Sequence, residues 1–489
     1  MIWILAGACA IAAVPAGLRW LRVAQREHYL PGEVTRFARR WWYETGLLNR
    51  VIYMLAFAGV IVSITAGPLP GLLVAAAQVG PVGLSVRGKT SSLAWTPRLI
   101  RLATGTGSIL VVCFVAGGLL GYPLLIVTPL FLLYWIVDLV LRALAPYERR
   151  AGQPWVDKAA AKLRDVAPDV VAITGSYGKT TAKRYVAHLL SGSRRVVASP
   201  ASFNNRMGLA RAINENLTPG TEIFVAEMGT YGPGEIAELC SWIQPKVAAL
   251  VSVGPVHLER FKTLENIVTA KAEILDRAEV GVICVDHPLL ADLARERARS
   301  MRVITVSGLD GIHVDGEKVM ETPDGVFAAN LAVALGVCKA LGVPIDDVVQ
   351  RVPGLPTTEH RQSVSVAAGG YTIIDDTFNS NPDGAASAVR SLVRKGSGGR
   401  TALITPGMVE LGPVQDVENR RLAEEAAARV DHLVIVGRTN RRALRQGSAN
   451  GKAAVTVLDT RAQAVEWARK NLGPGDAVLY ENDLPDHYP

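Results

Sequence analysis

The sequence predicts an α/β protein in which N-terminal transmembrane helices precede a P-loop central domain and a Rossmann-like C-terminal domain. Three observations support this fold class. Apolar runs long enough to cross a bilayer recur before about residue 145 of the 489. From about residue 147, short β-branched runs alternate with helical stretches, which is typical of a parallel sheet covered by helices. A second series of the same kind begins after Pro353, and a chain of this length has room for several cores.

The domain boundaries follow from these changes of pattern. We predict a transmembrane helical domain over residues 1–146, a central nucleotide-binding domain over 147–352 and the C-terminal domain over 353–489. About five membrane spans are expected, at residues 1–18, 51–66, 71–86, 104–121 and 123–143. The two runs within 51–86 are short for full spans, so a re-entrant or interfacial hairpin is an alternative there.

The charge pattern predicts how the membrane segment is oriented. The formal net charge of +8 and a basic loop could suggest nucleic-acid binding, but seven arginines lie in one segment between apolar runs, which favours positive-inside topology and no nucleic-acid partner. We therefore expect a multi-pass protein of the bacterial cytoplasmic (inner) membrane, with the bilayer as a partner and the later domains in the cytoplasm. These arginines are Arg19, Arg22, Arg26, Arg36, Arg39, Arg40 and Arg50.

The five cysteines are scattered and form no CxxC pair, so neither a disulfide framework nor a zinc site is indicated. In the soluble part, eight β-branched runs are expected as buried strands. The first four are Val170–Thr174, Ile223–Glu227, Val247–Val253 and Gly281–Val285, and the second four are Tyr371–Asp375, Thr401–Thr405, His432–Val436 and Ala477–Tyr480.

Two segments compete as the phosphate-binding loop. Gly83–Thr90 fits the pattern G-x-x-x-x-G-K-[ST], but it follows a membrane exit and the residues after it are a poor helix start. Residues 175–181 lack the first glycine of the pattern, because Ile173 occupies that position. They nevertheless follow a β-branched strand and precede an amphipathic stretch that ends at Leu190, so backbone N–H groups would point at phosphates.

We therefore predict that residues 175–181 bind the phosphates of ATP. In this loop Lys179 can reach the β and γ phosphates, and Thr180 can hold Mg²⁺. The loop comprises Gly175, Ser176, Tyr177, Gly178, Lys179, Thr180 and Thr181.

Six ordered motifs between about residues 165 and 480 together resemble the Mur ligase family. They are the loop Thr174–Thr181, Phe203–Gly208, Glu227–Gly229, Gly254–Glu259, Lys271–Ile274 and Asp375–Pro382. The resemblance implies an ATP-dependent ligase in which a substrate carboxylate attacks the γ-phosphate and an amine then attacks the acyl phosphate. Such a reaction gives an amide, ADP and phosphate, and it requires cations at the transferring phosphoryl group and exclusion of water.

The resemblance also implies roles for single residues. Glu227 and His257, with Thr180, would hold Mg²⁺, and two ions are expected. Lys271 matches a lysine that is carbamylated in several members of the family. The expected catalytic residues are Lys179, His257 and Lys271. From its own pattern, however, Lys271–Leu275 resembles the solvated face of a helix.

The remaining predicted contacts are with substrate and nucleotide. Asn204 and Asn205 are expected to position substrate or phosphate, with an Asx turn as the alternative. The resemblance implies that five residues contact the nucleotide: Asn330, Arg361, Asp376, Asn379 and Asn381. Those in the Asp375–Pro382 motif would reach it when the third domain closes.

The sequence departs from the family pattern on the acceptor side. Membrane helices occupy the place of the small domain that grips UDP in soluble members, which favours a lipid-linked or membrane-proximal substrate. Val326-Phe327 replaces a His-Asn pair, Pro406-Gly407-Met408 replaces Gly-Asp-Met, and Glu481-Asn482-Asp483 replaces Lys-Gly-Ser. The acidic end could attract a cationic amine, but a solvated tail is the plainer expectation.

Three function classes follow. The first is a cell-envelope ligase of peptide, amino-acid or lipid-linked carboxylates and amines, with a capsule-type poly-glutamate synthase as a variant. The second, an ATP-driven transporter, is disfavoured because no Leu-Ser-Gly-Gly-Gln signature follows the loop. The third is a catalytically inactive membrane nucleotide sensor or scaffold, against which the retained Lys179, Thr180 and Glu227 argue.

Overall fold

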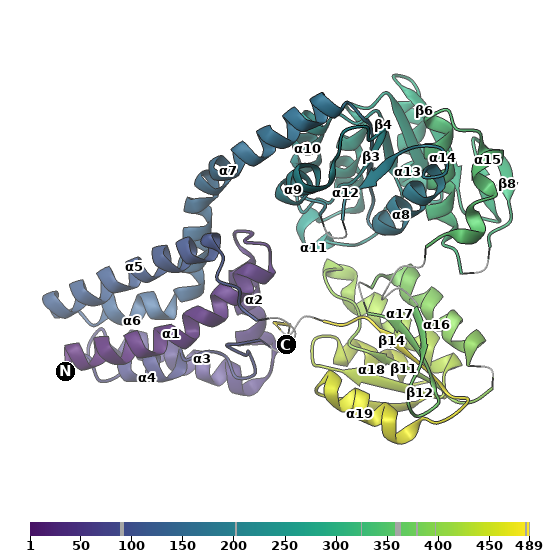
Figure 1. Cartoon of the computed structure of the whole chain (residues 1–489). Helices are drawn as coiled ribbons and strands as arrows, with labels where there is room; N and C mark the ends of the chain where they lie inside the picture. The colour runs from purple at the N-terminus through teal and green to yellow at the C-terminus, as the bar shows by residue number, and fades with distance from the viewer. Residues whose placement is uncertain are drawn as a thin grey trace. The chain divides into compact units, whose positions relative to one another are not determined.

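The computed structural model describes residues 1–88, 92–200, 203–323, 325–356, 363–377, 380–396, 398–484 and 487–488 (Figure 1). The chain divides into two compact units. The first contains Met1–Ala151, Gly437–Arg441 and Asp483–Pro489, and the second contains Gly152–Val436 and Arg442–Asn482.

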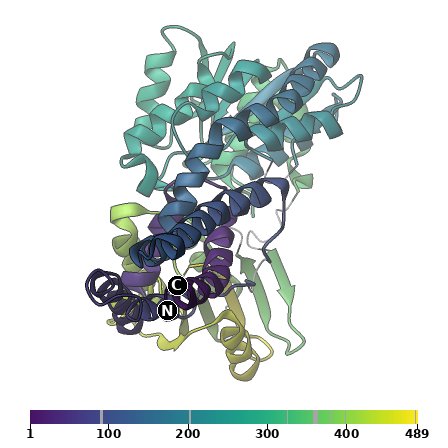
Figure 2. The ribbon, with the colours of Figure 1, turned by 90° about the vertical axis from the view of Figure 1, so that its left-hand side faces the viewer.

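The first unit is helical, and its helices pack side by side in both views (Figures 1 and 2). Its elements are α1 (Ile2–Arg26), α2 (Glu33–Arg39), the π-helical turn η1 (Arg40–Glu44), α3 (Leu47–Val62), α4 (Gly71–Ala77), α5 (Pro97–Leu120), α6 (Leu124–Phe131) and α7 (Leu133–Val166). Helix α7 continues into the second unit.

Among the described residues, α1 and α5 are long and apolar enough to cross a membrane. Two bent pairs, residues 33–44 with α3 at 110° and α6 with α7 at 74°, raise the number to at most four if each pair is one span. The run at 71–86 is helical only over Gly71–Ala77, too short for a hydrocarbon core of about 30 Å. It packs against α3, as the predicted hairpin alternative requires.

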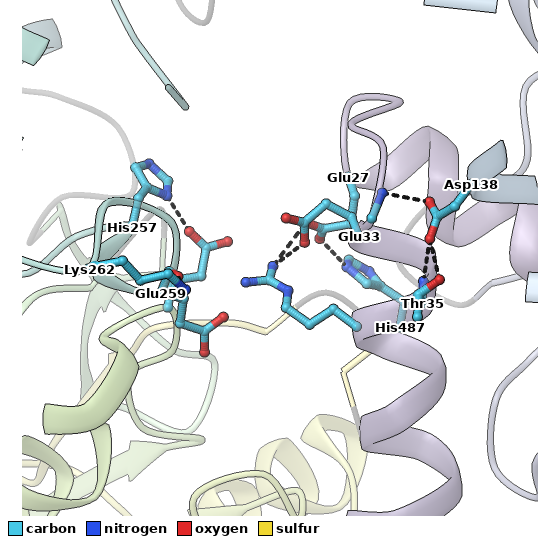
Figure 3. Close-up of polar contacts among 11 residues, drawn as sticks. Glu27, Glu33, Thr35, Asp138, His257, Glu259, Lys262 and His487 are labelled. Carbon is cyan, nitrogen blue, oxygen red and sulfur yellow. Dashed lines mark hydrogen bonds and ion pairs between the residues drawn. The ribbon is translucent and has the colours of Figure 1, made fainter. Parts of the chain in front are cut away.

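A buried carboxylate on α7 ties the first unit together. Asp138 accepts hydrogen bonds from the backbone N–H groups of Gly32 and Thr35, both at 2.8 Å, and from the Thr35 hydroxyl (Figure 3). A carboxylate buried on an apolar helix requires such donors to offset its desolvation. Gly32 has φ +97°, a left-handed conformation that glycine adopts without a steric penalty. Asp138 thus fixes the start of α2.

The second unit begins with an eight-stranded sheet in the order β2-β3-β1-β4-β5-β6-β7-β8, parallel except at β7 and β8. Its strands are β1 (Asp169–Thr174), β2 (Val196–Ala198), β3 (Ile223–Glu227), β4 (Val247–Leu250), β5 (Val280–Cys284), β6 (Arg302–Ser307), β7 (Ile312–Val314) and β8 (Glu317–Met320). The four strands predicted here are confirmed to within three residues at each end, because both faces of a parallel sheet are buried and the strands read as continuous apolar runs.

Helices cover both faces of this sheet, with one hydrophobic core on each side. Val170 and Ala172 belong to one core, and the alternate residues Val171 and Ile173 belong to the other. The helices are α8 (Lys179–Leu190), α9 (Arg206–Asn216), α10 (Glu235–Ile243), α11 (Leu258–Phe261), α12 (Leu264–Ala272), η2 (Glu273–Leu275), α13 (Pro288–Arg297), α14 (Ala328–Ala340), α15 (Ile345–Val349) and η3 (Val352–Gly354).

A second, six-stranded sheet follows residue 362, in the order β13-β12-β11-β14-β10-β9. Only its edge strand β9 is antiparallel. Its elements are β9 (Ser363–Val366), β10 (Thr372–Asp376), α16 (Pro382–Lys395), β11 (Thr401–Thr405), η4 (Gly412–Val414), α17 (Gln415–Arg429), β12 (His432–Val436), α18 (Arg441–Ser448), β13 (Ala454–Leu458), α19 (Arg461–Asn471) and β14 (Ala477–Glu481). The predicted α/β class with a Rossmann-like C-terminal part is confirmed.

Strands β3, β1 and β4 are neighbours and parallel, so their carboxyl ends meet at one edge of the first sheet. The segments after these strands start at Gly175, Met228 and Val251. In open parallel sheets this edge is where ligands bind. The predicted site residues of the central domain therefore converge here.

Candidate active site

The loop after β1 is held in shape by the segment after β4. Ser176 exchanges hydrogen bonds with Gly254, and its backbone N–H donates to the Ser252 carbonyl at 2.9 Å. The Tyr177 N–H donates to the Ser252 hydroxyl at 2.8 Å. Helix α8 begins within the predicted segment, at Lys179. The order of strand, turn and helix that the sequence predicted around 175–181 is therefore present, and this order suits anion binding.

Position 178 requires glycine for two reasons, its left-handed backbone conformation and the lack of space for a Cβ atom. Its φ is +76°, and a Cβ placed there would lie 2.1 Å from Oδ1 of Asn330. Asn330, on α14, is 7% exposed and therefore lies directly against the loop. The competing segment at Gly83 has no strand before it, and the next helix begins only at Pro97; its Lys89 and Thr90 lie outside the described residues.

Two lysines meet at the loop carbonyls. The Lys179 ammonium donates to the Gly175 carbonyl at 2.8 Å, and that of Lys271 donates to the same oxygen at 3.1 Å. Lys271 is 5% exposed, so the interpretation of its segment as a solvated helix face is wrong. Burial, and secondarily the charge of Lys179, holds the pKa of Lys271 well below its ordinary value. A larger fraction of Lys271 is therefore neutral and nucleophilic.

Glu227 ends β3 and lies at the start of α8. Its Oε2 accepts from the Thr180 hydroxyl at 3.0 Å and from the Lys183 ammonium at 2.9 Å. Burial by itself would raise the pKa of Glu227, but the charges of Lys183 and Lys179 outweigh it, and the pKa lies below its ordinary value. Glu227 is thus an ionised carboxylate beside a hydroxyl, a combination that suits Mg²⁺.

Lys183 was not predicted. It is 3% exposed and also donates to the Pro200 carbonyl at 3.3 Å. One signal was available, since positions 179 and 183 are four residues apart and share one face of a helix.

The two neighbouring asparagines have different contacts. Asn204 donates from Nδ2 to Oε1 of Glu227 at 3.3 Å. Asn205 is the N-cap of α9, and its side-chain oxygen accepts from the Gly208 N–H at 2.9 Å. Asn204 therefore lies at the carboxylate, whereas Asn205 caps a helix and does not form the Asx turn that was the alternative.

His257 precedes α11 with φ +58°, a conformation uncommon for a residue other than glycine. Its Nδ1 forms a hydrogen bond with the carboxylate of Glu410, from the loop before η4 (Figure 3). Its ring packs edge-on against Tyr231, with centroids 5.1 Å apart. A carboxylate on one ring nitrogen is the usual arrangement when the other nitrogen binds a metal. Glu410 is a second residue that sequence reasoning missed.

Two cavities collect these side chains. One is lined by residues that include Lys179, Lys271, Asn204, His257 and Tyr231. The other is lined by Tyr177, Gly178, Thr181, Asn330, Asp376, Ser380 and Asn381, among others. Arg361 and Asn379, which the sequence also predicted at the nucleotide, lie outside the described residues.

Comparison with known proteins decides the family. The Mur ligase middle domain matches residues 173–333, and the Mur ligase glutamate ligase domain matches residues 360–480. The UDP-N-acetylmuramoyl-tripeptide–D-alanyl-D-alanine ligase of Mycobacterium leprae is 30% identical over 367 residues, which cover 63% of this chain and 70% of that protein. This chain belongs to the Mur ligase family. It is accordingly an ATP-dependent, ADP-forming amide ligase that uses Mg²⁺.

Other relatives agree with this assignment. The enzyme of the same name from Bacillus subtilis is 25% identical over 345 residues, covering 66% of this chain and 75% of that protein. The MurF ligase of Thermotoga maritima in complex with ADP is 26% identical with a TM-score of 0.56, covering 68% of this chain and 80% of that one. A MurF structure from Acinetobacter baumannii has a TM-score of 0.58 at 23% identity, covering 68% and 77%, and supports the fold.

The residues of this ligase fit the nucleotide and its metal. The Thr181 hydroxyl and the Tyr177 hydroxyl are buried without a hydrogen-bond partner among the described residues, and both residues line the cavity at the loop. Bound Mg²⁺ commonly takes one or two carboxylates and completes its shell with water and substrate phosphates. Thr180 and Glu227, which lie 3.0 Å apart, could supply such a partial shell. No group of three or more His, Cys, Asp or Glu ligands occurs within the described ranges.

The buried ion pair between Lys183 and Glu227 gives a stability prediction. Replacing Lys183 with methionine is expected to lower the free energy of unfolding by about 3 kcal/mol, because the Glu227 charge would stay buried without its partner. Mg²⁺ should raise the melting temperature of this variant more than that of the wild type, since the cation replaces the missing ammonium. Thermal melts with and without Mg²⁺ measure both effects.

Lys246→Met is the matched control for this prediction. It removes an ion pair to Asp169 in which both side chains are over 40% exposed, so a change of at most about 1 kcal/mol is expected. If Mg²⁺ raises the melting temperatures of Lys183→Met and of the wild type by the same amount, Glu227 does not bind the metal.

Glu481 is the first of the three residues that replace the Lys-Gly-Ser of the family pattern in the C-terminal domain. It ends β14, is 1% exposed and accepts hydrogen bonds from the hydroxyls of Ser380 and Thr405. Burial raises its pKa, although the two hydroxyls oppose this. Ser380 lines the cavity that contains Tyr177 and Asn330, so the Glu481 carboxyl group reaches this cavity through its hydrogen bond with Ser380.

A raised folded-state pKa predicts a pH dependence. The stability contributed by Glu481 is present below its unfolded pKa, near 4.5, and is lost as the pH rises through the folded value. Above that pH, Glu481→Gln should gain stability relative to the wild type by more than the roughly 0.5 kcal/mol typical of surface changes. Urea unfolding of both proteins across pH 4 to 8 checks this. Glu466→Gln, on the exposed face of α19, should show no such trend.

Proposed function

We propose that this chain is a membrane-anchored ligase of cell-envelope, peptidoglycan-type biosynthesis that joins a carboxylate to an amine through an acyl phosphate. The observation that supports it best is one cavity lined by Lys179, Lys271, Asn204 and His257, beside the Thr180–Glu227 pair. Cations here would stabilise charge on the phosphoryl group as the substrate carboxylate attacks it. The named relatives, which act on a UDP-linked muramoyl tripeptide, support the pathway class.

The chemistry divides between ATP and the protein. Mg²⁺-ATP supplies the transferable phosphoryl group. The loop at 175–181 would orient the phosphates, Thr180 and Glu227 would hold the metal, and Asn204 would position a polar group of the substrate. Glu227 carries its charge at neutral pH because its pKa is low. Asn330, Asp376 and Asn381 would contact the nucleoside, and movement of the C-terminal domain would exclude water from the acyl phosphate.

The substrate proposal follows from the N-terminal helices. The family matches begin at residue 173, and α1 and α5 could each cross a bilayer. We infer a multi-pass protein of the bacterial cytoplasmic membrane, with domains 147–352 and 353–489 in the cytoplasm. A carboxylate or amine that is lipid-linked or held near the membrane suits such a ligase, because the anchor raises its local concentration.

The test measures phosphate release by the chain in detergent. Release should require Mg²⁺-ATP, a carboxylate donor and an amine acceptor together, and mass spectrometry should find the coupled amide. Peptidoglycan precursors with a UDP or a lipid carrier and single amino acids are the donors to compare. If glutamate alone polymerises, the capsule-type synthase is correct. If ATP binds but no pair yields an amide, the protein is an inactive sensor or scaffold.

A further inference from the structure

His487 and Tyr488 are buried in the first unit, and we call these two residues the tail. His487 is 2% exposed and Tyr488 is 8% exposed. The acidic stretch that contains them was expected to be solvated. The expectation is wrong for these two residues, because their rings pack against buried side chains of the first unit.

Two hydrogen bonds hold His487. Its carbonyl oxygen accepts from the indole N–H of Trp41 at 2.8 Å. Its Nε2 lies 2.9 Å from a carboxylate oxygen of Glu27, and both side chains are nearly inaccessible, at 3% and 6% exposure (Figure 3). Buried polar groups must be paired to offset desolvation, so these contacts specify the position of the histidine.

Aromatic contacts hold the tail from the other side. The ring of Phe37, which is fully buried, lies 4.8 Å from the His487 ring and 4.9 Å from the Tyr488 ring, between centroids. The guanidinium of Arg40 lies over the Tyr488 ring at 5.6 Å. These are favourable distances for aromatic and cation–π pairs. We call Glu27, Phe37, Arg40 and Trp41 the tail socket.

The socket is built from elements close in sequence to one another but far from the tail. Glu27 caps α1, Phe37 lies on α2, and Arg40 and Trp41 begin the π-helical turn η1. Arg36 lies 3.6 Å from the Glu27 carboxylate, so a cation beside the socket already balances this acid. The tail adds an imidazole and a phenol ring to a surface that carries complementary groups for both.

The tail is continuous with the centre of the second sheet. It follows β14, which pairs with β10 on one side and β11 on the other. The chain passes between the two units after Ala151, on both sides of Gly437–Arg441 and after Asn482.

We propose that His487 and Tyr488 are a docking element whose binding site is the tail socket of the same chain. Docking attaches the chain after β14 to the membrane unit, in addition to the connection through α7, and this limits how far the C-terminal ligase domain can rotate. The alternative occupant, the tail of a second copy, is distinguished by the experiment.

Cysteine crosslinking of the full chain in detergent tests this proposal. Four native cysteines are buried, and Cys113 is replaced by serine. Arg40→Cys with Tyr488→Cys should form an intramolecular crosslink with a short bis-maleimide, because His487, Trp41 and Glu27 still hold the tail. The control pair combines Tyr488→Cys with Arg50→Cys, whose position is exposed in the same unit. This pair should crosslink at least about ten-fold more slowly than the Arg40→Cys pair.

Equal rates for the two cysteine pairs would overturn the proposal. A crosslinked dimer in place of the intramolecular product would overturn docking within one chain and assign the socket to a second copy. Trp41→Phe keeps an aromatic side chain but removes the indole N–H that donates to the His487 carbonyl, so it should slow the Arg40→Cys crosslink by at least about five-fold, the effect of one hydrogen bond. Because the assay reads proximity, its result is independent of ligase activity.

Discussion

Replacing Lys179 with alanine is expected to lower the rate of ATP-dependent amide formation by about 10²- to 10³-fold, the cost of removing one preorganised charge partner of a transition state. Lys179 is the first residue of α8, and its ammonium lies at the carbonyls of Gly175 and Ser176, at 2.8 and 3.3 Å. Phosphates bound by the loop would lie within its reach, where it would stabilise charge on the transferring group. Product formation in the presence of both substrates is the measurement.

The matched control for Lys179→Ala is Lys246→Ala, which removes an ammonium from the start of β4, away from the loop. It should retain activity near that of the wild type. Lys179→Arg should not restore the rate, because the larger, planar guanidinium cannot take the position that the ammonium has between the Gly175 and Ser176 carbonyls. Activity of Lys179→Ala above about a tenth of the wild-type rate would contradict the assignment of the loop.

Replacing Lys271 with alanine is expected to lower turnover by about 10- to 100-fold, the range seen when a group that supports a metal site is removed. Lys271 is buried on α12 and donates to the Gly175 carbonyl at 3.1 Å. Its low pKa favours the neutral amine, which can add to carbon dioxide and release a proton to give a carbamate. A carbamate would place a negative oxygen pair near the Mg²⁺ ligands.

Dependence on carbon dioxide separates the carbamate from a purely structural lysine. Removing dissolved carbon dioxide should lower wild-type activity, and bicarbonate should restore it, whereas Lys271→Ala should respond to neither. Carbon-13 NMR with labelled bicarbonate should show a carbamate signal in the wild type alone. A wild type that is indifferent to carbon dioxide and carries no labelled adduct would show that Lys271 acts as the amine.

Local pattern was sufficient for the central strands and the loop. Val170–Thr174 and Ile223–Glu227 are apolar because helices cover both faces of the sheet, so they could be found without knowing their neighbours. Strands β2, β6, β7, β8, β9 and β13 were missed. For β2 and β7 the reason is that three residues carry too little periodicity. The run at 71–86 was overextended because apolar composition does not distinguish a span from a short helix against α3.

Sequence reasoning brought the correct residues together where a motif lies at a strand end, and it missed contacts whose partners come from elsewhere. Glu227 ends β3 and Lys179 lies just beyond β1, so sheet topology alone brings them to one edge. The burial of Lys271 depends on α12 packing behind the loop, and the cap made by Asn205 depends on where α9 starts.

The sequence by itself determined that this protein has an apolar helical start, a phosphate loop after a buried strand and two α/β parts, because these properties are set by residues within one or two turns of each other. Only the tertiary structure decided that Lys183 pairs with Glu227, that Glu410 meets His257 and that His487 binds beside Glu27 and Trp41. Each of these contacts joins side chains from distant segments, and their pairing depends on packing and desolvation rather than on any local period.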